Sequence, residues 1–94
     1  MRLSEDEVKV LKQSLSRLSS NAKLYLFGSR VDDSKKGGDI DLLIVAKDFT
    51  KKHLRKLRID FFKHFGEQKM DIVVDDGSFI DPFHKIIYKK AVRL

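Results

Sequence analysis

Two neighbouring stretches decide the fold: LYLFGSR at residues 24–30 and DIDLLIV at residues 39–45. Each contains an apolar run that is too short for a helix and is typical of a buried strand. The polar segment between the runs, at residues 28–38, has glycine at both ends and predicts a loop. The two stretches therefore predict a hairpin of two strands with a long polar connection.

Helices and one more strand are predicted around this hairpin. Apolar spacing and capping residues predict helices at about residues 5–19 after Ser4, at about residues 51–65 after Asp48 or Thr50, and from Asp81-Pro82 to the C-terminus. A third strand is predicted at residues 70–74. We therefore expect an α+β fold in the order α-β-turn-β-α-β-α, with a small three-stranded mixed sheet and helices packed on one face. The length favours one domain, residues 1–94.

The composition excludes several classes of protein. The chain has no cysteine, which excludes disulfide frameworks and thiolate sites. No apolar run approaches the ~18–20 residues that cross a bilayer, and no secretory signal is present, so we expect a cytoplasmic protein without a membrane partner. The net charge of +6 fits either a polyanionic partner or a solvated surface. No aromatic residues interleave on the basic face of the second helix, so direct binding of nucleic acid stays an unsupported alternative.

The second stretch begins with a pair of acids, Asp39 and Asp41, at the head of an otherwise apolar strand. Residues two apart in a strand point to the same face, so the two carboxylates are expected to be neighbours that repel each other. A divalent cation explains the pairing, because Mg²⁺ takes oxygen ligands and usually only one or two protein carboxylates, leaving room for phosphates. The alternative is an exposed strand end at which both acids are simply solvated.

The first stretch ends in Gly28-Ser29-Arg30, three residue types that suit phosphate. Glycine allows close approach, successive N–H groups in a turn form an anion-binding concavity, and the serine hydroxyl and arginine fork add donors. Such a tripeptide alone is an ordinary turn. The hairpin, however, brings it to the same end of the sheet as the paired acids. This combination predicts a site for a metal–nucleotide complex.

A third acid, Asp71, lies inside the apolar strand at residues 70–74. An unpaired carboxylate is unfavourable there, although Asp71 can also be a solvated strand start. If it faces the pair, three carboxylates complete a two-metal site for in-line displacement at phosphorus. Because Asp75 and Asp76 follow the same strand, the identity of the third acid stays open.

The glycine-serine pair, the spacer and the Asp39-Ile40-Asp41 strand resemble the defining motif of the DNA polymerase β-like nucleotidyltransferase superfamily. The order of helices and strands is similar to that fold over essentially the whole chain. The short length resembles the minimal nucleotidyltransferase group. Many members of that group are encoded beside a HEPN-domain toxin and act as its antitoxin.

The resemblance implies a role for each residue of the motif. The nucleotide-binding residues would be Gly28, Ser29 and Arg30. The catalytic residues and ligands of two Mg²⁺ ions would be Asp39, Asp41 and Asp71, with Asp71 also a candidate general base. There are departures from the family pattern: the acids Asp32 and Asp33 lie in the spacer, and Gly38 stands where serine is frequent.

The resemblance also implies an activity, the Mg²⁺-dependent transfer of a nucleoside monophosphate, usually AMP from ATP, to a hydroxyl. In the HEPN pairs that hydroxyl can be a tyrosine of the toxin. A chain of 94 residues leaves no room for a separate acceptor-binding domain, so we expect a protein acceptor and a homodimer or hetero-oligomer. Two alternatives stay open. One is a degenerate module that neutralises its partner by contact, and the other is a small-molecule nucleotidyltransferase of the aminoglycoside type.

Overall fold

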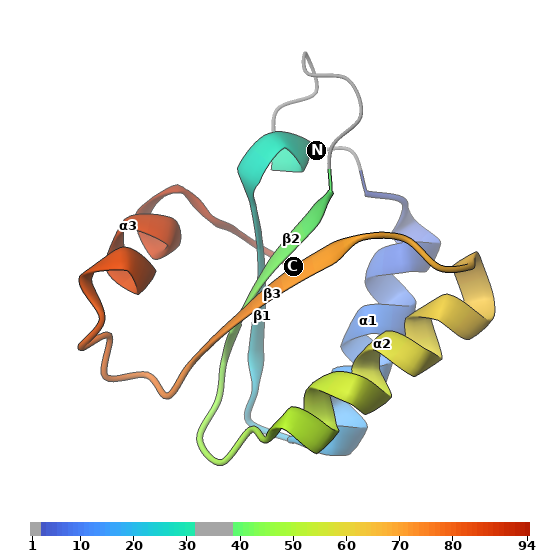
Figure 1. The fold of residues 1–94 in the computed structure, drawn as a ribbon, viewed down its shortest axis with the longest axis horizontal. Coiled ribbons are helices and arrows are strands. Elements are labelled where there is room, and N and C mark those ends of the chain that lie inside the picture. The colour runs from blue at the N-terminus through green and yellow to red at the C-terminus, as the bar shows by residue number, and fades with distance from the viewer. Residues whose placement is uncertain (1–2, 32–38) are drawn as a thin grey trace.

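The computed structural model describes residues 3–31 and 39–94, and its sheet stands between helices on both sides (Figure 1). The elements follow in the order α1 (Glu5–Leu18), β1 (Lys23–Phe27), the 3-10 helix η1 (Gly28–Val31), β2 (Ile40–Val45), α2 (Lys51–Phe65), β3 (Met70–Asp75), α3 (Pro82–Lys90) and β4 (Val92–Arg93). The three predicted helices and three predicted strands are all present, which confirms the α+β class. Within the described ranges, no helix combines the length and the apolar character that crossing a membrane requires.

Local capping starts the helices where the sequence predicts. The Ser4 hydroxyl accepts from the Glu7 N–H at 3.1 Å, and Glu7 Oε1 accepts from the Ser4 N–H at 3.0 Å. Thr50, rather than Asp48, caps α2, and Asp81 caps α3. Each cap supplies a partner for a backbone N–H that the first helical turn would otherwise leave unpaired.

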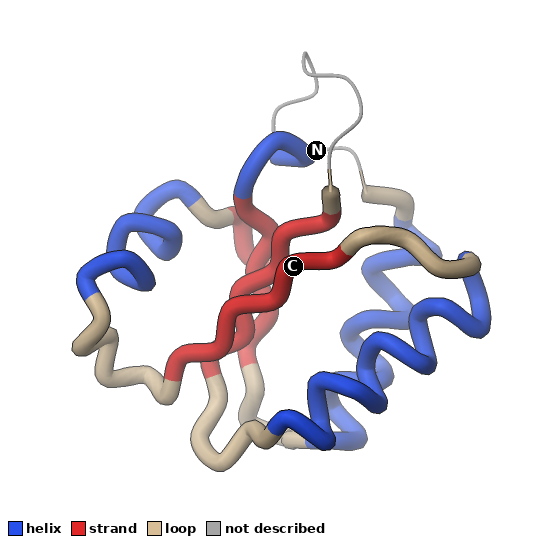
Figure 2. The backbone as a smooth tube through the Cα atoms, viewed as in Figure 1, coloured by secondary structure: helices blue, strands red, loops and turns tan. Residues whose placement is uncertain are grey.

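The strands form one mixed sheet in the order β3-β2-β1-β4 (Figure 2). β1 and β2 are the antiparallel hairpin, and β3 runs parallel to β2. The parallel pair needs a crossover connection, which α2 provides. β4 pairs antiparallel with the other edge of β1.

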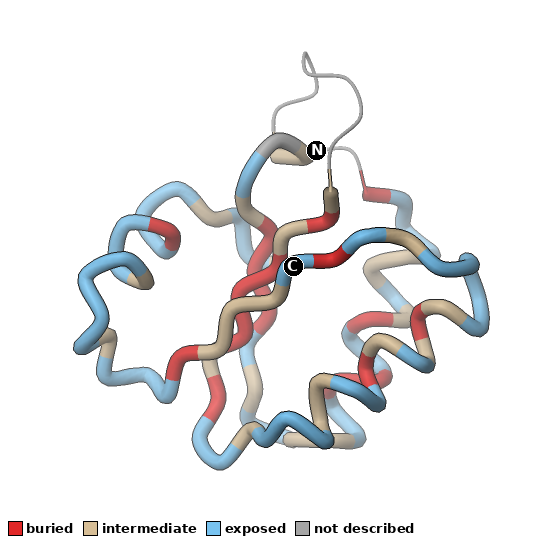
Figure 3. The backbone as a smooth tube through the Cα atoms, viewed as in Figure 1, coloured by how far each residue is buried: buried red, intermediate tan, exposed pale blue. Residues whose placement is uncertain are grey.

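The two faces of the sheet pack against different helices (Figure 3). Side chains alternate along β2, so Leu42 and Ile44 face one side and Leu43 faces the other. The larger core joins the first side to α1 and α2, and its fully buried members are Leu11, Leu26, Ile40, Leu42, Ile44, Leu57 and Phe61. The smaller core joins Tyr25 and Leu43 to Ile87 of α3. We call this second side the α3 face.

Three details of the predicted architecture are wrong. The helices do not all pack on one face, because the apolar side chain of Ile87 meets the strand residues that point away from α1 and α2. The sheet also has four strands rather than three. The last helix ends at Lys90 instead of reaching the C-terminus, since Ala91 is extended and Val92–Arg93 pairs with the open edge of β1.

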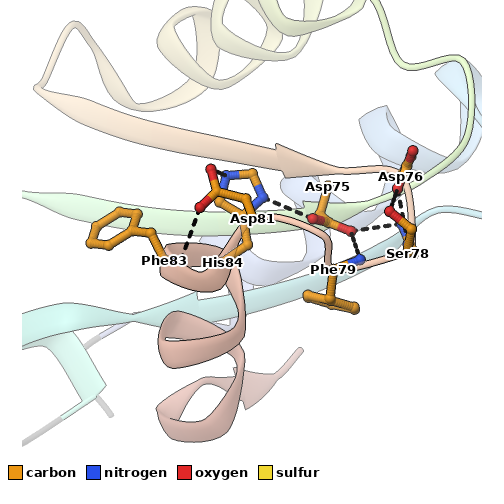
Figure 4. A network of polar contacts seen from close by, with 8 residues as sticks. Asp75, Asp76, Ser78, Phe79, Asp81, Phe83 and His84 are labelled. Carbon is orange, nitrogen blue, oxygen red and sulfur yellow. Dashed lines mark hydrogen bonds and ion pairs between the residues drawn. The ribbon is translucent and has the colours of Figure 1, made fainter.

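A buried carboxylate fastens the start of α3 to the end of β3 (Figure 4). Asp75 is only 5% exposed, and its Oδ1 accepts from the N–H groups of Gly77 at 2.7 Å and Phe79 at 3.1 Å. Its Oδ2 lies 2.8 Å from His84 Nδ1, while His84 Nε2 lies 3.5 Å from Asp81 Oδ2. A protonated imidazolium can donate to both carboxylates. Burial by itself raises the pKa of Asp75, but the hydrogen bonds from His84, Gly77 and Phe79 outweigh it and lower that pKa.

Asp75→Asn is therefore expected to destabilise the fold by about 2 kcal/mol at neutral pH, the usual contribution of hydrogen bonds to a charged group. The pKa of Asp75 is lower in the folded than in the unfolded chain. The ionised group thus stabilises the fold above the unfolded value of about 3.9, and that contribution is lost as the pH falls through the folded value. Urea unfolding should show a large difference between wild type and variant at pH ~7 and a smaller one at pH ~2.

The matched control is Asp76→Asn. Asp76 is the next residue, and hydrogen bonds from Ser78 lower its pKa as well, but these bonds are exposed to solvent and contribute little to stability. This control should change the free energy of unfolding little. An equal loss in Asp75→Asn at both pH values would show that the carboxylate charge does not fasten α3.

Candidate active site

One end of the α3 face carries carboxylates from two strands. Asp41 of β2 is the register partner of Phe27 in β1 and of Asp71 in β3. Register partners point to the same side of a sheet, and Asp41 shares that side with Leu43, two residues on. Asp39, two residues before Asp41, belongs to the same side by the same alternation. The structure therefore brings Asp39, Asp41 and Asp71 together, and we call these three side chains the acidic row.

Gly28 packs directly against the acidic row. It follows β1 with a φ of +77°, a conformation that residues with side chains rarely adopt. A Cβ atom added at Gly28 would overlap Asp41 Oδ2 and would lie 3.0 Å from Asp41 Cγ. Glycine is needed here both for the turn into η1 and for the space that the Asp41 carboxylate occupies.

Charge repulsion is concentrated on Asp41. Burial raises the pKa of its carboxyl above the ordinary value, and the neighbouring carboxylates of Asp71 and Asp39 raise it further. The ammonium of Lys69 acts in the opposite direction, and its Nζ lies 3.4 Å from Asp39 Oδ2. The acidic row is thus an electrostatically unfavourable arrangement that a bound cation would relieve.

The family model of the nucleotidyltransferase domain matches residues 8–93, nearly the whole chain. The chain belongs to the nucleotidyltransferase domain family. Nucleotidyltransferases transfer a nucleotidyl group from a nucleoside triphosphate and generally use divalent metal ions. A search of the curated proteins returned no match.

In this nucleotidyltransferase domain, the predicted phosphate-binding residues follow Gly28 directly. Ser29 and Arg30 continue the chain in η1, at the same end of the sheet as the acidic row. The spacer acids Asp32 and Asp33, like Gly38, lie outside the described residues. The roles of Gly28, Ser29 and Arg30 toward a nucleotide stay predictions.

Two acids of β3, Asp71 and Asp75, lie at opposite ends of the strand. Asp71 lies beside Asp41, whereas Asp75 pairs with Val45 at the opposite end of the strands. Asp75 is also occupied by three hydrogen-bond donors at the start of α3. Of these two acids, only Asp71 therefore lies beside Asp41.

The donor chemistry of the acidic row fits a divalent cation. Carboxylate oxygens are the ligands that Mg²⁺ prefers, and the repulsion on Asp41 is what such an ion would remove. Within residues 3–31 and 39–94, however, no three His, Cys, Asp or Glu side chains stand in an arrangement that could already hold a metal ion. Binding of a metal ion would therefore need the carboxylates of the acidic row to reorient.

Sequence reasoning missed one residue at this end of the sheet. In the sequence Lys69 is one more basic residue in the segment after α2, yet in the structure it contacts Asp39 and acts on Asp41. Its position two residues before Asp71 could have predicted that Lys69 lies near the acids. In a parallel pair with Asp41 opposite Asp71, Lys69 necessarily lies opposite Asp39.

Replacing Gly28 by alanine tests its close approach to Asp41. Gly66→Ala is the matched control, because Gly66 has a φ of +79° but open space around the position of a Cβ. The control should lose only the cost of the backbone conformation, about 1–3 kcal/mol of the free energy of unfolding. Gly28→Ala should lose at least about 1 kcal/mol more, because its methyl group also displaces the carboxylate.

Urea unfolding of the two variants measures this difference. Adding Asp41→Ala to Gly28→Ala should recover part of the extra loss, since the smaller side chain leaves room for the new methyl group. Equal losses in the two glycine variants would contradict the packing of Gly28 against Asp41.

Proposed function

We propose that this domain catalyses the Mg²⁺-dependent transfer of AMP from ATP to a hydroxyl of a partner protein. We further propose that the partner is a HEPN-domain toxin, for which this chain is the antitoxin. The observation that carries the proposal is the acidic row, three carboxylates on one sheet face with a glycine turn packed against the central one. Family membership supports nucleotidyl transfer as the reaction.

Each residue has a place in the proposed reaction. Asp39, Asp41 and Asp71 would hold the metal ions, which when bound neutralise the triphosphate and activate the acceptor hydroxyl. Gly28 and Ser29 would hold the β- and γ-phosphates, with Arg30 as an additional phosphate contact. Every residue of the acidic row and of the turn after β1 thus has a role in the proposed reaction.

The bonds of the transfer balance without a further reactant. The acceptor hydroxyl oxygen attacks the α-phosphorus and forms a phosphodiester bond. The bond from the α-phosphorus to the bridging oxygen breaks, and pyrophosphate leaves with the electron pair. The proton of the hydroxyl passes to a base, and the exposed carboxylate of Asp71 is our candidate.

A protein acceptor is supported by exposed apolar side chains of α3 and of the turn before it, on the same side of the sheet as the acidic row. Ile80 is 84%, Phe83 62% and Ile86 59% exposed, so apolar side chains at and before α3 face solvent. Ala91, where α3 ends, packs in the same cluster as Phe27, the register partner of Asp41. A protein held by the apolar side chains of α3 would therefore lie on the same side of the sheet as the acidic row, with the end of α3 toward Phe27 and Asp41. The complex would be a hetero-oligomer, and we place the reaction in the cytoplasm, where ATP is available.

Labelled ATP tests the proposed function. With ATP labelled on the α-phosphate, Mg²⁺ and the purified HEPN-domain protein of the neighbouring reading frame, label should appear on that protein. Asp39→Asn and Asp41→Asn should each lower the rate by on the order of 100-fold, because each removes a charged ligand of the metal ions. Asp76→Asn, an exposed acid outside the site, is the control and should retain activity.

Two results would contradict the proposal. Neutralisation of the partner that survives Asp39→Asn and Asp41→Asn, without any label, would identify a module that acts by contact. Label on a small molecule or on RNA instead of the partner protein would show that the acceptor is of another class.

A further inference from the structure

The acidic row has a cation of its own in this structure. Lys69 Nζ lies 3.4 Å from Asp39 Oδ2, an ion-pair distance. Its backbone is fixed there as well, because the carbonyl oxygen of Lys69 accepts from the N–H of Ile40 at 3.2 Å. The sheet thus holds the start of the lysine side chain next to the acids, whatever the ammonium contacts.

The ammonium acts on more than one carboxylate. Alternation along the strand places Lys69 on the same side as Asp71, which lies beside Asp41. Its charge also opposes the repulsion that Asp39 and Asp71 exert on Asp41. Lys69 therefore supplies positive charge to the acidic row, as a bound metal ion would.

The ion pair can be exchanged easily. The Lys69 side chain is 73% exposed and that of Asp39 is 38% exposed, so both reach solvent. Exposed ion pairs of this kind contribute little to stability and are readily replaced. A lysine side chain is a flexible stem with a compact charge, which suits phosphate once the carboxylate is taken by another cation.

We propose that Lys69 is a positioning residue of the nucleotidyltransferase site: it neutralises Asp39 while no metal ion is bound, yields Asp39 to an incoming divalent cation, and then pairs with a phosphate of the nucleotide. This proposal rests on the proposed function, because it takes Asp39 as a metal ligand. It predicts that the lysine opposes metal binding and favours nucleotide binding, which are effects of opposite sign.

Two binding measurements on the purified full chain test this role. Lys69→Met keeps an unbranched side chain without the charge. Without nucleotide, the variant should bind Mn²⁺ about 3-fold more tightly than wild type, followed by the electron paramagnetic resonance signal of free Mn²⁺. With Mg²⁺ present, it should bind the non-reactive α,β-methylene analogue of ATP about 3-fold more weakly, followed by calorimetry.

Control variants separate the contact with Asp39 from a general effect of charge. Lys52→Met removes an exposed charge from α2, which packs on the opposite face, and should leave both affinities unchanged. Lys69→Arg keeps the charge and should restore both affinities toward wild type. In an Asp39→Asn background, Lys69→Met should no longer tighten Mn²⁺ binding, because the carboxylate for which the two cations compete is absent.

The outcomes distinguish the two proposals. If wild type binds Mn²⁺ and the analogue but Lys69→Met changes neither affinity, or weakens both, the role of Lys69 is wrong and the proposed function stands. Tighter Mn²⁺ binding that persists in the Asp39→Asn background also overturns it, because the effect is then not competition at Asp39. If wild type binds neither ligand, the proposed function and the role of Lys69 both fail.

Discussion

Repulsion among the carboxylates of Asp39, Asp41 and Asp71 is the constraint on which the functional part of this structure depends. Without the pairing of β2 with β3, Asp71 could move away from the other two acids. The antiparallel hairpin and the parallel pairing of β2 with β3 hold them on one face instead. Both pairings are secured by the larger core, in which the opposite side of the same strands packs against α1 and α2. Burial of apolar side chains on one face thus stabilises an unfavourable arrangement of charge on the other.

The α3 face shows two treatments of the same residue type. Asp75, at one end, is buried and surrounded by hydrogen-bond donors, and its pKa is lowered. Asp41, at the other end, has two carboxylates as neighbours, and its pKa is raised. Asp75, whose oxygens accept hydrogen bonds, fastens α3 to the sheet. Asp41, which lies beside two other carboxylates, would be stabilised by a nearby positive charge. Lys69 supplies part of that positive charge, through its ion pair with Asp39 and its effect on Asp41.

Much of the fold could be predicted because its signals are local. The sequence signals that predict the hairpin, the three helices and the caps at Ser4 and Asp81 each lie within a short segment of the chain. The side of the sheet that α3 covers was not predictable in this way, because it depends on how Ile87 meets Tyr25 and Leu43 from distant parts of the chain. The short strand β4 was missed for a similar reason. Its two residues form a strand only because β1 offers an open edge.

The candidate site also has a part that could be predicted from local sequence and a part that depends on contacts between distant residues. The acids at 39 and 41 and the glycine turn belong to one predicted hairpin and could be singled out in the sequence. The neighbour of Asp41 on β3 is set by the register across the α2 crossover, and this register places Asp71 rather than Asp75 beside it. The register also brings Lys69 to Asp39. Sequence reasoning named Asp71 through the family resemblance, but the neighbour of Asp41 on β3 follows only from the register.

The most direct test of the account is to map where a divalent cation binds, by the broadening that small amounts of Mn²⁺ cause in the amide signals of the protein. The account predicts that broadening appears first at Gly28, Asp41 and Asp71, and that Asp41→Asn abolishes it. Broadening centred on Asp75 and Asp76, or no localised broadening at all, would show that the acidic row is not the metal site.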